Sequence, residues 1–301
     1  MGKRIFFGLL LIAFVCGVFY ADWFLQSDQA WCPFDLSPLP LTLLTAGLII
    51  VGYIEFRRMI ASAGVQLPLA TGMLCCLVIG TMPFWWPVLM FVCEKSKCST
   101  FVGLMVLPAD IAVVGLLLGV VFLEQLARHR LEDILRRLAL TFLAVGYLGV
   151  CGHLVLSIRT VVGLKAFVLF LAAVKCSDIG AYFTGKFLGR HKLVEWLSPK
   201  KTWEGFFGGL AFAACVSLVL NRVMWMDMAP WSAAVFGLAM GALGQGADLC
   251  ESALKRAAGV KDAGAVLPEF GGVLDILDSL LLTAPAALVL LSVLTMGHLV
   301  L

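Results

Sequence analysis

The side chains best suited to chemistry gather in one stretch of an otherwise apolar chain, residues 244–279, which reads GQGADLCESALKRAAGVKDAGAVLPEFGGVLDILDS. Asp248 lies near the end of one apolar segment, and Asp275 and Asp278 begin the next. If both segments are helices, the connecting loop brings these carboxylates to one membrane surface. The basic residues between them are Lys255, Arg256 and Lys261. Carboxylates beside a basic cluster suit a divalent cation and a phosphate-rich substrate. The alternative is an ordinary water-facing loop with solvated charges.

On the segment that carries Asp248, the side chains of Asp248, Ser252 and Lys255 share one helix face. Glu251 and Lys255 are four residues apart, so they are also expected to pair with each other. After the loop, Gly271–Gly272 lets the chain turn closely before Asp275.

A second group of charges lies upstream, where Lys175 and Asp178 are three residues apart within an apolar run. This spacing puts both on one helix face, and pairing lowers the cost of placing charges in a membrane. One interpretation is a structural ion pair. The other is that Asp178 and Tyr182, which are one helical turn apart, line a polar cavity.

The basic loop after this run contains Ser198–Pro199, followed by Lys200, Lys201 and Thr202. Serine is a good helix N-cap and proline suits the first helical position, so we expect a helix to begin here. Free N–H groups at its start, with two lysines beside them, would form an anion site. Gly205 and Gly209 then form a G-x-x-x-G pattern, which predicts a helix-packing face. The alternative is a loop that merely attracts anionic lipid headgroups.

The elements that position these residues are expected to be transmembrane helices. Of the 301 residues, 61% are hydrophobic and only 14% are charged, with a mean hydropathy of +1.01. Soluble domains of this size do not have such a composition, so the fold class is all-α and polytopic. Hydropathy predicts nine spans. They cover approximately residues 5–25, 39–56, 67–92, 100–123, 138–158, 162–184, 205–221, 231–250 and 274–296.

The lysines and arginines between these spans predict the orientation, because positive residues are enriched in cytoplasmic loops. Most fall on the side of the N-terminus. They are Lys3, Arg4, Arg57, Arg58, Arg128, Arg130, Arg136, Arg137, Lys186, Arg190, Lys192, Lys200, Lys201, Lys255, Arg256 and Lys261. The other side receives Lys95, Lys97, Arg159, Lys165 and Arg222. The bias predicts a cytoplasmic N-terminus and an outer C-terminus.

A composition shift near residue 160 divides the chain into two expected regions. Residues 1–160 would be a transmembrane scaffold of about five spans. Residues 161–301 would be a catalytic region with cytoplasmic loops at 185–204 and 251–272. Cys93 and Cys98 fall in an expected outer loop, where a disulfide is one option and free thiols are the other.

Residues 175–209 and 244–279 resemble the CDP-diacylglycerol synthase family, also called phosphatidate cytidylyltransferase. The family's closing motif runs S-x-hydrophobic-K-R-x4-K-D, then P-x-H-G-G-x-x-D-R-x-D. Its positions are matched here by Ser252, Lys255, Arg256, Lys261, Asp262, Pro268, Gly271, Gly272, Asp275 and Asp278. The upstream match covers Asp178, Ala181, Tyr182, Gly185, Gly189, Arg190, His191, Lys192, Ser198, Pro199, Lys200, Lys201, Thr202, Glu204 and Gly205. Two positions depart, since Phe270 replaces the motif's His and Ile276 its Arg.

The resemblance implies that CTP and phosphatidate react to give CDP-diacylglycerol and pyrophosphate. The implied cofactor is Mg²⁺, with a second metal ion left open. Implied catalytic residues are Asp248, Asp275, Lys255 and Asp178, of which Asp248 and Asp275 would hold the metal. Implied substrate-binding residues are Ser198, Lys200, Lys201, Thr202, Glu204, Arg256, Lys261, Asp262 and Asp278. The implied partners are CTP, phosphatidate and membrane lipids, with no nucleic acid, and association into a homodimer is expected. The implied location is the inner membrane, with the active site facing the cytoplasm.

Three alternatives stay open at this point. The chain could be another CTP-using lipid-phosphate enzyme, such as a polyprenol kinase, or could act on a different lipid. It could be an ion-coupled transporter with Lys175, Asp178 and Asp248 along the ion path. It could also be an inactive relative, given Phe270 and Ile276.

Overall fold

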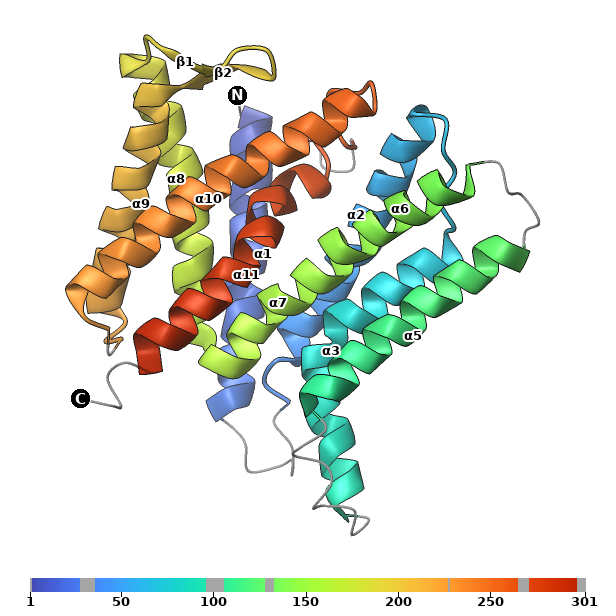
Figure 1. Ribbon diagram of the computed structural model, residues 1–301. Helices are drawn as coiled ribbons and strands as arrows, with labels where there is room; N and C mark the ends of the chain where they lie inside the picture. The colour runs from blue at the N-terminus through green and yellow to red at the C-terminus, as the bar shows by residue number, and fades with distance from the viewer. Residues whose placement is uncertain are drawn as a thin grey trace. The chain divides into compact units, whose positions relative to one another are not determined.

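The computed structural model describes residues 2–27, 36–95, 106–127, 133–226, 228–264 and 271–296, which are almost entirely helical (Figure 1). Contacts between Cα atoms divide the chain into two compact units. The first unit comprises Met1–Leu156 and Ala263–Leu274, and the second comprises Ser157–Asp262 and Asp275–Leu301. The expected division into a scaffold and a catalytic region is a statement about function and stays a prediction.

The first unit contains a series of long apolar helices. In chain order they are α1 (Gly2–Ser27), α2 (Leu39–Ser62), α3 (Ala70–Lys95), α5 (Val106–Ala127), α6 (Ile134–Ala144), a π-helical stretch (Val145–Val150) and the start of α7 (Cys151–Ser157). α2 packs on α1 and α3, and α3 also packs on α5 and α6. Cys98 lies outside the described residues, so the choice between a Cys93–Cys98 disulfide and free thiols stays open.

The second unit contains the remaining helices and one hairpin. In chain order they are a π-helical stretch (Ile158–Val162), α8 (Leu164–Leu188), β1 (Lys192–Val194), β2 (Ser198–Thr202), α9 (Trp203–Val223), α10 (Pro230–Ala257) and α11 (Leu274–Met296). α9 lies against both α8 and α10, and the hairpin lies at the end of this group (Figure 1).

The fold class expected from the sequence is confirmed. Each of the nine predicted spans coincides with a helical stretch in the part of the chain that the structure describes. Among the described residues, eight helical stretches are long and apolar enough to cross a membrane, whereas the apolar part of α5, Ile111–Ala127, is shorter. Large apolar side chains such as Leu9, Ile12 and Phe14 of α1 point outward, as in helices that face lipid. The orientation of the termini stays a prediction.

Small residues let α8, α9 and α10 pack closely. A Cβ atom added to Gly209 would lie 2.8 Å from the carbonyl oxygen of Ser177 on α8. A Cβ atom added to Gly205 would lie 2.9 Å from the carbonyl oxygen of Ala181, also on α8. The predicted packing role of the G-x-x-x-G pattern is therefore confirmed, and it lets the backbones of α8 and α9 approach closely.

The expected helix start at Ser198–Pro199 is wrong. Residues 198–202 form β2, which pairs antiparallel with β1 so that Lys192 lies opposite Thr202. α9 begins at Trp203, and the Thr202 hydroxyl caps it by accepting a hydrogen bond from the Gly205 N–H (3.2 Å). Ser198 and Thr202 are both good N-caps, and pairing with β1 selects the later one. Proline is tolerated because this two-stranded sheet consists of edge strands.

A buried carboxylate in the first unit holds the start of α11. Glu55 of α2 is fully buried, and its Oε2 accepts a hydrogen bond from the N–H of Leu274 (2.9 Å). A Cβ atom added to Gly272 would lie 2.7 Å from this oxygen, so only glycine fits there. Gly271 has a φ of 93°, which favours glycine. The predicted close turn at Gly271–Gly272 is confirmed.

The packing between α9 and α10 leads to a testable prediction. Gly237→Ala would place a Cβ atom 2.6 Å from the carbonyl oxygen of Ala213, and the backbone cannot yield without separating the helices. We expect it to lower the free energy of unfolding by about 1–3 kcal/mol. The measurement is thermal unfolding of the purified protein in detergent.

The matched control is Gly246→Ala on the same helix, where an added Cβ atom meets nothing within 4 Å. Because alanine favours helix over glycine by up to about 1 kcal/mol, the control should be neutral or stabilising. Equal effects of the two substitutions would contradict the close approach of α9 and α10.

Candidate functional site

The second unit contains a polar cavity of about 520 Å³. Its walls come from α8, β2, α9, α10 and the start of α11. The lining residues are Lys175, Asp178, Ala181, Tyr182, Gly185, Lys186, Lys200, Lys201, Thr202, Gly205, Phe206, Gln245, Asp248, Asp275, Asp278 and Ser279. The expectation that Asp178 and Tyr182 line a polar cavity is confirmed.

Lys201 joins the hairpin to α10. Its ammonium group forms an ion pair with Asp248 and donates a hydrogen bond to the carbonyl oxygen of Gln245 (3.2 Å). The Gln245 amide nitrogen donates in turn to the carbonyl oxygen of Phe206 on α9 (3.1 Å). One lysine therefore neutralises a carboxylate and fixes β2 against the helix that bears it.

Lys175 joins α8 to α11. Its Nζ atom lies 3.8 Å from an oxygen of Asp178, which confirms that these two charges pair. It also donates to the carbonyl oxygen of Ile276 (2.7 Å) and to the hydroxyl of Ser279 (2.8 Å). The contact at Ile276 uses the backbone, so it does not depend on the side chain that replaces the motif's arginine.

Lys255 lies between two carboxylates. Its Nζ atom is 2.5 Å from Glu251 and 3.0 Å from Asp275. The predicted pairing of Glu251 with Lys255 is confirmed. Lys255 is not one of the residues that line the cavity, but it holds the side chain of Asp275, which does line it.

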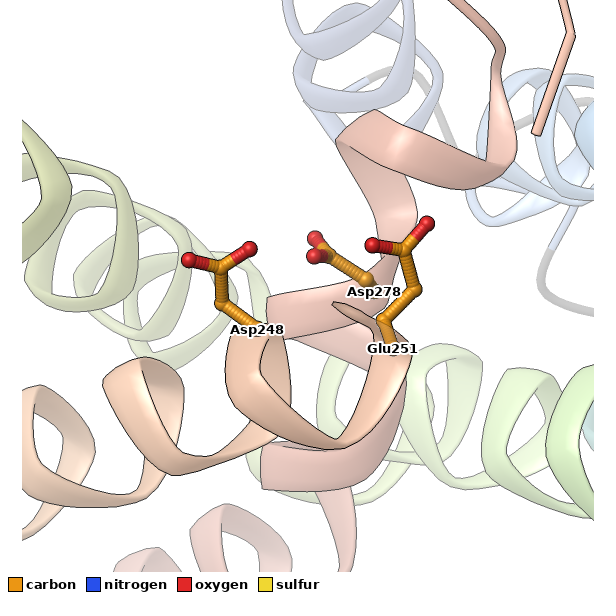
Figure 2. Close-up of side chains that lie close together, drawn as sticks. All are labelled: Asp248, Glu251 and Asp278. Atoms are coloured by element: carbon orange, nitrogen blue, oxygen red, sulfur yellow. The ribbon is translucent and has the colours of Figure 1, made fainter. Parts of the chain in front are cut away.

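A group of carboxylates lies where α10 meets α11. Figure 2 shows Asp248 and Glu251, from successive turns of α10, beside Asp278 of α11. One oxygen of each lies within 4.8 Å of the others. Asp278 is 3% exposed and Glu251 is 2% exposed, so their charges are largely shielded from water.

These donors fit a hard divalent cation. Oxygen ligands are what Mg²⁺ prefers, and buried carboxylates that lie side by side repel each other unless a cation lies between them. Neither oxygen of Glu251 has a hydrogen bond of good geometry within the described residues, although its ion pair with Lys255 is short. The group includes Asp248, as the sequence predicts, but contains Asp278 and Glu251 where the sequence analysis expected Asp275. The assignment of Asp275 as a metal ligand stays a prediction.

The residues that the sequence predicts for the site divide into two sets, those that line the cavity and those that do not. Seven line the cavity, namely Asp178, Lys200, Lys201, Thr202, Asp248, Asp275 and Asp278. The others are not among its lining residues: Ser198, Glu204, Lys255, Arg256, Lys261 and Asp262. Glu204 instead accepts hydrogen bonds from the backbone N–H of Arg190 (3.0 Å) and from the ring of His191 (2.6 Å), so it fixes the loop that enters β1.

Sequence reasoning missed three polar residues. Gln245 and Ser279 line the cavity, and each could have been found as a polar side chain close to a predicted aspartate in an apolar segment. Glu55 of the first unit could have been found as a carboxylate inside a predicted span. Phe270 and Pro268 of the closing motif lie outside the described residues.

Comparisons with known proteins agree with this picture. A family model described as the cytidylyltransferase family matches residues 3–294. A phosphatidate cytidylyltransferase of Bacillus subtilis is 32% identical over 252 residues, which cover 83% of this chain and 88% of that protein. Proteins with the same name from Staphylococcus epidermidis and Staphylococcus aureus are each 37% identical over 153 residues, or 51% of this chain. In these staphylococcal comparisons the chain spans 58% of the relative's length.

The position of the Lys255 ammonium group between Glu251 and Asp275 leads to a second prediction. Lys255→Met keeps the length of the side chain but removes the positive charge that pairs with these two shielded carboxylates. We expect it to lower the free energy of unfolding by about 3–5 kcal/mol, measured as thermal unfolding in detergent.

The control is Lys261→Met, which makes the same change of charge at an exposed position. Adding Glu251→Gln to Lys255→Met should restore part of the lost stability, because one of the uncompensated charges is then removed. If Lys255→Met is as mild as the control, the ion pairs do not stabilise the fold.

Proposed function

We propose, from the premise that this chain belongs to the cytidylyltransferase family, that it transfers the cytidylyl group of CTP to phosphatidate. The products would be CDP-diacylglycerol and pyrophosphate. The observation that carries the proposal is the cavity of the second unit, in which lysines of α8 and β2 face carboxylates of α10 and α11. The names of the relatives supply the substrates.

In the proposed reaction a phosphate oxygen of phosphatidate attacks the α-phosphorus of CTP. The bond from the α-phosphorus to the bridging oxygen breaks, and pyrophosphate leaves with the electron pair. Because the attacking oxygen is already anionic, no strong base is required. The protein's contribution is then to position the reactants and to neutralise their charge.

The cavity residues suit these tasks. Lys200 and Lys186 line the cavity and could contact the triphosphate as point charges. Asp248, Glu251 and Asp278 would hold Mg²⁺, which when bound neutralises charge on the triphosphate. Lys201 and Lys175 keep Asp248 and Asp178 in place and add positive charge to the wall. The homodimer and a second metal ion stay predictions.

Direct turnover tests the proposal. Purified protein with labelled CTP and phosphatidate should give labelled CDP-diacylglycerol and pyrophosphate only when Mg²⁺ is present. Asp248→Asn and Asp278→Asn should each lower the rate at least about 100-fold, because they remove a charge from the proposed ligands. Asp133→Asn, an exposed change in the first unit, is the control.

Other outcomes distinguish the alternatives. A polyprenol kinase would release CDP in place of pyrophosphate, and an enzyme for another lipid phosphate would be inactive with phosphatidate. Near-normal activity of Asp278→Asn together with loss in Asp275→Asn would restore Asp275 as the ligand. Absence of turnover with any lipid phosphate would indicate an inactive relative.

We further propose that the cavity faces the cytoplasm. The support is the uneven distribution of positive residues between the two ends of the helices.

Two exposed tryptophans provide a matched test, because α9 separates them in the chain. Trp196 in the hairpin is 84% exposed, and Trp225 after α9 is 80% exposed.

In a cysteine-depleted background, Trp225→Cys should react with an impermeant maleimide in intact cells. Trp196→Cys should react only after the cells are opened, because the membrane protects it. The reverse pattern would invert the topology, and labelling of both in intact cells would show that α9 does not span the membrane.

A further inference from the structure

The first unit contains a second cavity, of about 560 Å³, and none of its lining residues lines the first one. It is formed where α2, the start of α3, the end of α5 and the start of α6 come together. Its charged residues are Arg57 of α2, Glu124 of α5 and Arg137 of α6. The backbone from Leu67 to Ala70, which leads into α3, completes the wall.

Arg57 is held in place by a backbone contact. Its Nε atom donates a hydrogen bond to the carbonyl oxygen of Leu67 (3.0 Å). The Tyr53 hydroxyl donates to the carbonyl oxygen of the next residue, Pro68, so the same loop is fixed at two points. The outer nitrogens of Arg57 have no partner among the described residues, which leaves its two-pronged edge available to a ligand.

Arg137 lies in the first turn of α6 and is half-buried. Its guanidinium forms no hydrogen bond or ion pair within the described part of the chain. No ion pair joins Arg137 to Glu124 among the described residues, and Glu124 accepts a hydrogen bond from the hydroxyl of Thr71. Two guanidinium groups thus line one cavity against a single carboxylate.

The backbone adds to this positive character. α3 begins at Ala70 and runs for 26 residues, so its first N–H groups and the positive end of its dipole lie at the cavity wall. Leu67, Pro68 and Leu69 provide apolar surface beside these groups. The cavity can therefore accept an anion that carries a carbon skeleton.

We propose that this cavity is a second anion site, which binds a phosphate-bearing group through Arg57 and Arg137. The planar fork of a guanidinium matches two oxygens of a phosphate, and two such groups can hold it from two sides. The phosphate belongs either to a lipid headgroup or to a small soluble molecule. The proposal depends only on the first unit and is independent of the function proposed for the second.

The test compares two arginines that differ in placement but not in charge. Arg137→Gln removes a guanidinium from the cavity. Arg58→Gln makes the same change of charge at the exposed residue next to Arg57, outside the cavity. The probes for the full-length protein in detergent are phosphatidylglycerol, zwitterionic phosphatidylcholine and inorganic phosphate. Bound lipid is counted by native mass spectrometry, and phosphate binding is measured by the shift in unfolding temperature.

We expect Arg137→Gln to weaken binding of phosphatidylglycerol at least about tenfold, since a charge-assisted contact is lost, while Arg58→Gln leaves it unchanged. Arg137→Lys should fall between wild type and Arg137→Gln, because the charge remains without the fork. It also serves as the test variant if Arg137→Gln does not fold. The difference in phosphatidylglycerol binding between Arg137→Gln and Arg58→Gln should persist when Lys201→Ala is added, because Lys201 lines the first cavity.

The probes separate the two sources. If Arg137→Gln weakens binding of phosphatidylglycerol alone, the site belongs to a lipid headgroup. If it weakens binding of inorganic phosphate alone, the site belongs to a small soluble molecule. The proposal is overturned if Arg137→Gln and Arg58→Gln affect every probe equally. It is also overturned if phosphatidylcholine binds as well as phosphatidylglycerol and is insensitive to Arg137.

Discussion

Carboxylates that are withdrawn from water need positive charge close by, and the second unit depends on meeting this need. Asp178, Asp248, Glu251 and Asp275 each form an ion pair with a lysine. Asp278 is 3% exposed, close to Asp248, and forms no ion pair with a lysine among the described residues. The excess of carboxylates over their lysines is the physical basis of the proposal that a divalent cation binds here. The same lysines connect α8, β2, α10 and α11, so charge neutralisation and the shape of the cavity are inseparable.

Much of this arrangement could be predicted because it depends on local spacing. Hydropathy locates each helix, since a helix that crosses lipid must be predominantly apolar over about 20 residues. The pairs Lys175–Asp178 and Glu251–Lys255 follow from residues three or four apart on one helix. The close packing at Gly205 and Gly209 follows from small residues on one helix face.

Local spacing is a weaker guide where residues far apart in the chain determine the structure. The start of α9 depends on pairing between β1 and β2, because Ser198 and Thr202 are both acceptable caps when considered alone. Lys255 reaches Asp275 from another helix, whereas Asp278 lies beside Asp248 and Glu251. A motif shows that both aspartates matter, but it cannot show which one faces Asp248. No spacing rule joins Glu55 to Leu274, which lies 219 residues further along the chain.

That long separation has a consequence for how the protein is made. A ribosome adds about 5–20 residues per second, so the 219 residues between Glu55 and Leu274 take on the order of 10–45 s to synthesise. During that interval α2 carries a carboxylate whose final partner does not yet exist. Until α11 emerges, this group needs water or another polar partner, because an unpaired charge in hydrocarbon is costly. α11 therefore completes an environment that α2 lacks until the intervening helices have been made.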